Sequence, residues 1–129
     1  MSLVKKIKDK RVNFEFNKEY INVVINKIAN NDALFITNSF KEMHPSDAAD
    51  IIEHLSQNDR EKLIKLNNFK IDPQVFIEFN ESVQSEIIRY LSSDAIIAIL
   101  KNLESDDAIT ILENVDEKDK NLILSSLPP

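Results

Sequence analysis

The sequence predicts an all-α fold in which short antiparallel helices stack into a solenoid. Two observations lead to this prediction: apolar residues recur every twelve residues from His44 onward, and polar residues that favour helix starts separate the repeats. A third is composition, because the 129 residues are 43% hydrophobic and contain no glycine. Tight hairpin turns and phosphate-binding loops depend on glycine, so this composition argues against hairpins and excludes glycine-rich nucleotide sites.

The repeat is clearest at the eighth, ninth and twelfth positions of seven units that run from His44 to Leu127. Twenty of these 21 sites are apolar, whereas a hydrophobic content of 43% would place about nine there by chance. The exception is Asn67, which has Leu66 beside it. The eighth positions are Ile51, Leu63, Val75, Ile87, Ile99, Ile111 and Ile123, the ninth are Ile52, Ile64, Phe76, Ile88, Leu100, Leu112 and Leu124, and the twelfth are Leu55, Asn67, Phe79, Leu91, Leu103, Val115 and Leu127.

This spacing predicts one short helix in each unit. Apolar sites at i, i+1 and i+4 share one helix face, but twelve residues at ~100° each would turn the stripe by ~120° from unit to unit. The chain must therefore break between units, which leaves helices of about eight or nine residues that are stable only when stacked. We expect breaks near 30–32, 43–45, 55–57, 67–72, 79–81, 91–93, 103–105 and 115–117.

Upstream of the repeat, Asn17 is expected to cap a helix that ends at Ala29, and Asp32 to start a second helix from Ala33 to Met43. Asparagine, present fourteen times, is expected at helix ends because it tolerates the left-handed conformation. An extended strand is weakly indicated by the alternating Val12, Phe14 and Phe16. Asp72 and Pro73 predict a late helix start in their unit. Five side chains are expected to be deeply buried: Ile99, Leu100, Leu103, Ile111 and Leu112.

Charge divides the chain into a basic start and an acidic body. Residues 1–18 carry six Lys/Arg against two acids, a balance of +4, and the other residues carry ten against twenty, a balance of −10. We expect a solvated basic tail over 1–16 and a helical-repeat domain over 17–129. The acidic body argues against nucleic-acid binding, which depends on neutralising phosphates. The longest apolar run, Ala95 to Leu100, is too short for a membrane span.

No constellation of catalytic residues is evident, so we expect no enzymatic activity. The chain has no cysteine, which excludes thiolate metal sites and thiol nucleophiles. His44 and His54 are the only histidines, and their spacing matches no metal-ligand pattern. His44 is expected at a helix entry and His54 on an exposed helix face.

The order of the motifs points to a family. A helix "NNDALFITNSFKEM" leads into "HPSDAADIIEHL", and units such as "SSDAIIAILKNL" and "ESDDAITILENV" follow in register. Over 31–127 this arrangement resembles the cytoplasmic N-terminal domain of MgtE-type magnesium transporters. The resemblance implies a right-handed superhelix that precedes two CBS domains and a membrane pore. A related repeat domain occurs in the flagellar motor switch family, so a protein-interaction scaffold of that type is the alternative.

The resemblance also implies a function. The domain would be the cytoplasmic, magnesium-sensing part of a homodimeric transporter of the plasma membrane, and magnesium ions held between it and the CBS domains would control the pore. The chain ends at Leu127-Pro128-Pro129, where the family continues towards its CBS domains, so we expect an excised domain.

Transferred by position, the family's magnesium-binding acids fall on Asp106, Thr110 and Gln74. Only Asp106 keeps the carboxylate, so either sensing is weaker or neighbouring acids have taken it over. Asp107 is the first of these neighbours, and Glu104 and Glu113 are the others. A purely structural role for Asp106, as a negative charge near a helix N-terminus, is the competing interpretation.

Overall fold

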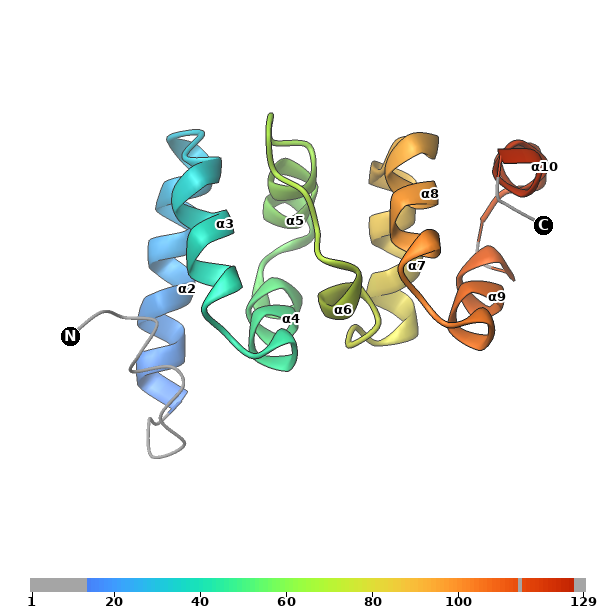
Figure 1. Cartoon of the computed structure of the whole chain (residues 1–129). Helices are drawn as coiled ribbons and strands as arrows, with labels where there is room; N and C mark the ends of the chain where they lie inside the picture. The colour runs from blue at the N-terminus through green and yellow to red at the C-terminus, as the bar shows by residue number, and fades with distance from the viewer. Residues whose placement is uncertain (1–13, 114, 127–129) are drawn as a thin grey trace. The chain divides into compact units, whose positions relative to one another are not determined.

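The structure, a computed structural model, describes residues 14–113 and 115–126. Every regular element in these ranges is an α-helix, which confirms the all-α prediction; the superhelical arrangement and its hand stay predictions. The chain forms two compact units, Met1–Lys70 and Ile71–Pro129. In chain order the helices are α2 (Phe14–Ala29), α3 (Ala33–Lys41), α4 (Pro45–His54), α5 (Gln57–Ile64), α6 (Pro73–Phe76), α7 (Glu81–Tyr90), α8 (Ser93–Lys101), α9 (Ser105–Glu113) and α10 (Glu117–Ser126) (Figure 1).

The helices end and begin where the twelve-residue register predicts, and polar side chains cap most of their starts. The Asp32 carboxylate accepts the Phe35 N–H at 3.2 Å, which confirms the expected start of α3. Asp72 and Pro73 begin α6 as expected, but this helix is only four residues long. The other N-caps are His44, Ser56, Asn80 and Ser92.

Two asparagines take the role that glycine has in many proteins. Asn31, two residues after the end of α2, has φ of 58°, and Asn68, in the turn that follows α5, has φ of 69°. This left-handed conformation is costly for most residues, but the short polar side chain of asparagine tolerates it. The expectation drawn from the absence of glycine is confirmed at both positions.

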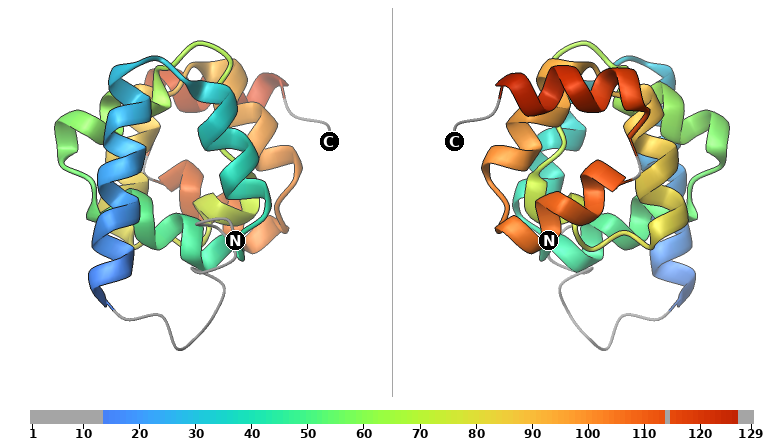
Figure 2. Two further views of the ribbon diagram at one scale, coloured as in Figure 1. Left: turned by 90° about the vertical axis from the view of Figure 1, so that its left-hand side faces the viewer. Right: turned by 90° about the vertical axis from the view of Figure 1, so that its right-hand side faces the viewer.

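In the first unit, α2 packs against α3, α4 and α5 (Figures 1 and 2). Tyr20, Val24 and Ile28 form its buried stripe at i, i+4 and i+8. The helix begins at Phe14, so Asn17 lies inside it and the prediction of a cap there is wrong. Phe16 stands four residues before Tyr20 and extends the apolar spacing upstream of Asn17, where an internal asparagine costs only a few tenths of a kcal/mol.

The weakly indicated strand is also wrong where the structure describes it. Phe14 and Phe16 belong to α2, and Val12 lies outside the described residues. The alternation of three residues is too short to distinguish a strand from the start of an amphipathic helix.

In the second unit, α10 packs on α8 (Figure 2).

The eighth repeat position is buried in all seven repeat units, and the ninth in all except the last, where Leu124 is 49% exposed. Four of the five predicted core residues are buried: Ile99, Leu100, Ile111 and Leu112.

Leu103 is only half-buried, so its prediction as a deeply buried residue is wrong. It lies two residues beyond the end of α8, in the turn that leads to α9. A twelfth-position side chain is placed by this turn and not by the helix, so helix periodicity does not fix its direction. Leu91, which holds the same position after α7, is half-buried as well.

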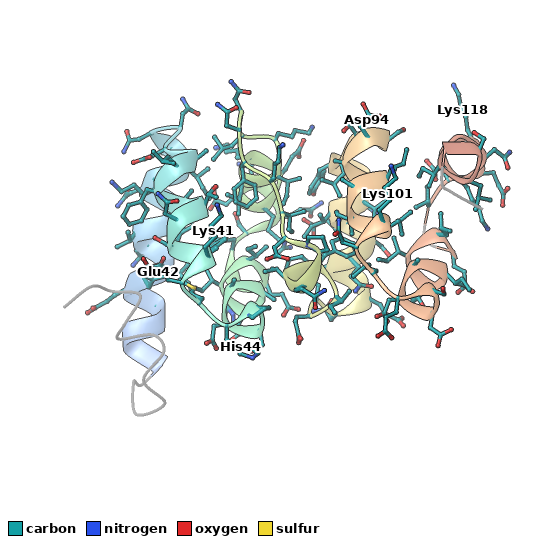
Figure 3. The ribbon with its side chains drawn as sticks, in the orientation of Figure 1. Lys41, Glu42, His44, Asp94, Lys101 and Lys118 are labelled. Carbon is teal, nitrogen blue, oxygen red and sulfur yellow. The ribbon has the colours of Figure 1, made fainter. Side chains whose placement is uncertain are left out.

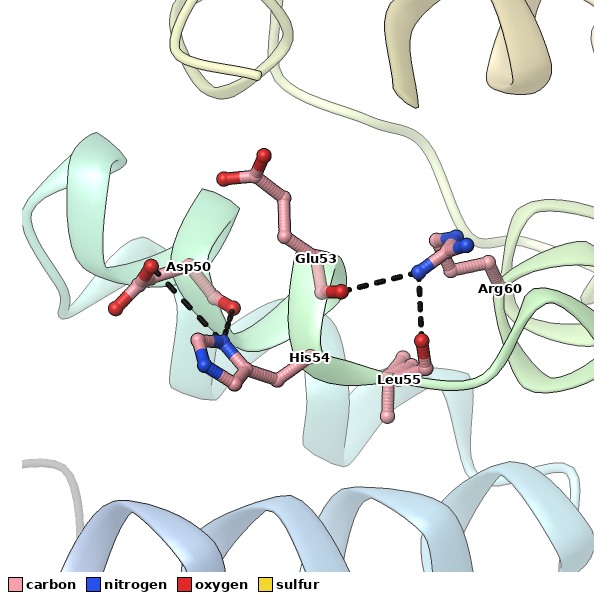
Figure 4. Close-up of polar contacts among 5 residues, drawn as sticks. All are labelled: Asp50, Glu53, His54, Leu55 and Arg60. Carbon is pink, nitrogen blue, oxygen red and sulfur yellow. Dashed lines mark hydrogen bonds and ion pairs between the residues drawn. The ribbon is translucent and has the colours of Figure 1, made fainter. Parts of the chain in front are cut away.

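Arg60 joins the end of α4 to the start of α5. Its Nη1 donates hydrogen bonds to the carbonyl oxygens of Glu53, at 3.0 Å, and Leu55, at 2.6 Å (Figure 4). The last carbonyls of a helix have no partner within the helix, and a guanidinium both satisfies them and complements the negative end of the helix dipole. This contact fixes the turn between two consecutive repeat units.

Tyr20 is fully buried between the helices of the first unit, beside the Ser39 side chain. Burial raises the pKa of Tyr20 above its ordinary value of 10.0, and the negative charge of Glu42 adds to this increase. The neighbouring Ser39 side chain lowers this pKa, but by less. The neutral phenol is therefore the form that the folded first unit favours.

Candidate metal-binding surface

The acids singled out from the sequence lie on and around α9. No lysine or arginine occurs from Asn102 to Glu117, a stretch that carries six acidic residues. Asp106 and Asp107 occupy the first turn of α9, and both are exposed. Negative charge is favourable there because the helix N-terminus has a partial positive charge. The local electrostatics therefore support the structural role of Asp106 and leave its carboxylate open to solvent.

Asp106, Thr110 and Glu113 follow one another at i, i+4 and i+7, which places them on one face of α9. All three are exposed. Asp107 is one residue further on and so lies about 100° around the helix. A single ion on this face would meet Asp106 or Glu113 before Asp107, because a carboxylate reaches only its own side of the helix.

Thr110 replaces a carboxylate by a hydroxyl that bonds within the helix. Its Oγ1 donates a hydrogen bond to the backbone carbonyl of Asp106 at 3.0 Å. A serine or threonine inside a helix commonly bonds the carbonyl four residues earlier in this way. The hydroxyl adds no charge to the face. The resemblance implies acids at positions 106 and 110, and at position 110 no carboxylate is present.

Gln74 lies in the first turn of the short helix α6 and is exposed. Its backbone N–H donates to the Asp72 carboxylate at 2.8 Å, so the nearest acid is used as a helix cap. Glu86 holds the same repeat position in the next unit, but it is buried and accepts a hydrogen bond from the Tyr90 hydroxyl at 3.0 Å. Neither Asp72 nor Glu86 is therefore a free replacement for the acid that Gln74 lacks.

Asp94 is an exposed acid that the sequence reasoning did not single out. It stands twelve residues before Asp106, in the first turn of α8 (Figure 3). The repeat register could have identified it, since Asp94 and Asp106 share the third position of consecutive units. The two helices differ in charge, however, because Lys101 lies in the last turn of α8 and α9 has no basic residue there.

The described residues bring no three His, Cys, Asp or Glu side chains together in a geometry that could hold a metal ion. Magnesium retains much of its hydration shell and is commonly bound through one or two protein carboxylates. The exposed acids of α9 can therefore supply part of a magnesium site, with the remaining ligands coming from water or from another surface.

The two histidines lie where the sequence predicts them. His44 caps α4, and its Nδ1 accepts the Ser46 N–H at 3.2 Å (Figure 3). His54 is exposed at the end of α4, where its Nδ1 donates to the Asp50 carbonyl at 2.7 Å (Figure 4). The Nδ1 atoms of His44 and His54 thus form hydrogen bonds to the backbone near the two ends of α4.

The fold and this surface define a class of protein: an all-helical repeat domain with an acidic, solvent-exposed helix. The family model described as the MgtE intracellular N domain matches residues 43–129, and the chain belongs to that family. It represents part of the N-terminal domain of a magnesium transporter, in a family of transporters and not of enzymes. No curated protein and no solved structure gives a significant match. Within residues 14–113 and 115–126, no helix is long and apolar enough to cross a membrane.

Proposed function

We propose that this chain is the regulatory, magnesium-sensing domain of a magnesium transporter. The observation that supports the proposal is the exposed acidic helix α9, with Asp106 in its first turn, in a chain that belongs to the MgtE intracellular N domain family. Magnesium ions would lie between Asp106 and the carboxylates of a CBS domain, and this docking would control the pore. In this proposal the chain is the cytoplasmic part of a homodimeric membrane protein.

The switch depends on charge neutralisation. Two acidic surfaces repel each other, and divalent cations between them remove that repulsion. The ions bind the docked arrangement more tightly than the separated one, because docking completes their coordination. A rise in magnesium therefore shifts the population towards the docked state, by an amount set by the difference in affinity.

Asp106 is the principal ligand in this proposal, and Asp107 is a secondary one. The replacements at Thr110 and Gln74 leave fewer carboxylates on the surface, so each ion gains less from docking. The response to magnesium should accordingly be shallower than in relatives that keep all three acids. Glu113 lies on the same face as Asp106 and is the acid on that face that could compensate.

The test compares magnesium affinity in two proteins by NMR titration: this chain alone, and this chain joined to the CBS domains expected to follow it. Alone, it should bind magnesium only in the millimolar range or more weakly, because exposed carboxylates replace little of the ion's hydration shell. Joined, it should bind more tightly, and Asp106→Asn should remove the gain.

Asp94→Asn is the matched control, since it removes a carboxylate from the same repeat position on α8. It should leave the gain in affinity unchanged. Equal magnesium affinity in the two wild-type proteins would overturn the proposal, and the alternative of a protein-interaction scaffold would replace it. An equal loss in both variants would show a diffuse effect of charge with no specific role for Asp106.

A further inference from the structure

Ile109 exposes 55% of its surface on α9, in a protein whose large apolar side chains are mostly buried. Among the described residues, Leu34 and Leu124 are the other exposed large apolar side chains. Ile109 lies three residues after Asp106 and four before Glu113, so it belongs to the same helix face. This face therefore consists of an apolar centre between two carboxylates, with Thr110 beside it.

Packing within the second unit shows what kind of element covers a helix in this fold. Ile97 stands at the corresponding position of α8, and it is half-buried in a helix on which α10 packs. Among the described residues no later helix packs on α9 in that way. An element that covers Ile109 as the fold covers its other apolar positions would be a helix with its own apolar stripe.

Charge restricts which helix would fit. The side chains around Ile109 include Asp106 and Glu113, and the stretch 102–117 has no basic residue that would neutralise them. An acidic or neutral helix would desolvate these carboxylates without compensation, whereas lysine or arginine beside its apolar stripe would pair with them. Charge complementarity and the helix-on-helix packing of the fold thus point to the same partner.

We propose that the α9 face formed by Asp106, Ile109, Thr110 and Glu113 binds an amphipathic helix of another protein that carries lysine or arginine beside its apolar stripe. Ile109 enters the apolar stripe, and the two carboxylates pair with the flanking cations. Such helix-in-groove recognition combines apolar anchors with charges that set specificity and orientation. The interaction needs no metal ion and does not depend on the magnesium-sensing function.

The test is fluorescence anisotropy in magnesium-free buffer, with a labelled synthetic peptide in which leucines at helical spacing are flanked by lysines. The wild-type chain should bind it, and a peptide with glutamate in place of each lysine should not bind. Ile109→Ser should weaken binding about five- to twentyfold, because the roughly half of an isoleucine side chain that is exposed here contributes about that much affinity when it leaves water. Asp106→Asn should weaken binding and reduce its dependence on salt.

Leu34→Ser is the matched control, because it removes a side chain of similar size that is 72% exposed on α3, in the other unit. It should leave the affinity unchanged. Circular dichroism of each variant checks that helix content is retained, and Ile109→Ala provides a second, milder substitution. The proposal is overturned if the peptide does not bind, if both Ile109 variants bind it as tightly as the wild type, or if Leu34→Ser weakens binding as much as Ile109→Ser does.

Discussion

Leucine occupies the ninth repeat position both in α8, as Leu100, and in α10, as Leu124, but the two side chains differ in burial. Leu100 is 4% exposed and Leu124 is 49% exposed. Truncation to alanine removes the same atoms at both sites. If the repeat position stabilises the protein through burial, the two substitutions must have different costs.

The cost follows from the atoms that leave a packed environment. Transfer of the lost groups to water accounts for roughly 2 kcal/mol at Leu100, and the cavity left behind raises the total to about 2–5 kcal/mol. At Leu124 about half of the surface is already in water and no closed cavity forms, so the expected cost is about 1 kcal/mol or less. Leu100→Ala should therefore be clearly more destabilising than Leu124→Ala.

Urea denaturation followed by circular dichroism measures both costs. With a slope of roughly 1.5–2 kcal/mol per molar urea, Leu100→Ala should lower the midpoint by about 1–3 M. Leu124→Ala should lower it by a few tenths of a molar unit. Equal midpoints for the two variants, or no shift for Leu100→Ala, would refute burial at the ninth position as the source of stability.

Three further substitutions test contacts within the units by the same denaturation assay. Arg60→Ala should lower the free energy of unfolding by about 1–3 kcal/mol, because two helix-end carbonyls lose their hydrogen-bond donor. Lys65→Ala, which breaks an exposed ion pair with Glu61, should lower it by under ~1 kcal/mol. Equal costs would exclude a capping role for Arg60. Asn80→Ala should cost about 1 kcal/mol, since the side chain caps α7 by accepting the Val83 N–H at 2.9 Å, and Asn80→Ser should restore most of that loss. Burial raises the pKa of Tyr20 in the folded chain, so the contribution of Tyr20 to stability is complete below pH 10 and declines as the pH rises above 10. Tyr20→Phe should remove this decline in stability at high pH. A pH profile of stability that is unchanged in the variant would contradict the role of Tyr20.

The repeat made most of the fold predictable. Residues such as Ile51, Leu63 and Ile87 recur at a fixed spacing, and capping residues mark the breaks, so element type and approximate bounds could be read without tertiary information. Burial at the eighth position followed from the same pattern and is confirmed in every unit.

The errors occur where neighbours and not periodicity decide the structure. Leu103 lies in a turn whose direction the helix period does not determine. Leu124, for which no burial was predicted, shows the same dependence: it has a core-type repeat position, but its exposure depends on what packs over α10. Two possibilities competed for the start of α2: capping by Asn17, or continuation of the apolar stripe past Asn17. The free energy gained by an asparagine cap and the cost of an asparagine inside a helix are comparable, so the sequence did not decide between them.

The candidate site was predictable only in its residue types. Spacing placed Asp106 and Thr110 on one face, but the Thr110 hydrogen bond to the Asp106 carbonyl and the burial of Glu86 are features of the three-dimensional structure that spacing does not determine. The exposure of Ile109 could not be read from the sequence either, because its counterpart Ile97 has the same residue type and repeat position and is half-buried.

Small-angle X-ray scattering of this domain joined to the CBS domains proposed to follow it, titrated with magnesium, tests the proposed magnesium-dependent docking most directly. The radius of gyration should fall as magnesium rises, and Asp106→Ala should move the midpoint to higher magnesium without changing the helix content of the domain. An identical midpoint in the variant would reduce Asp106 to a charge at a helix end. A wild-type radius that does not change with magnesium would contradict the sensing function itself.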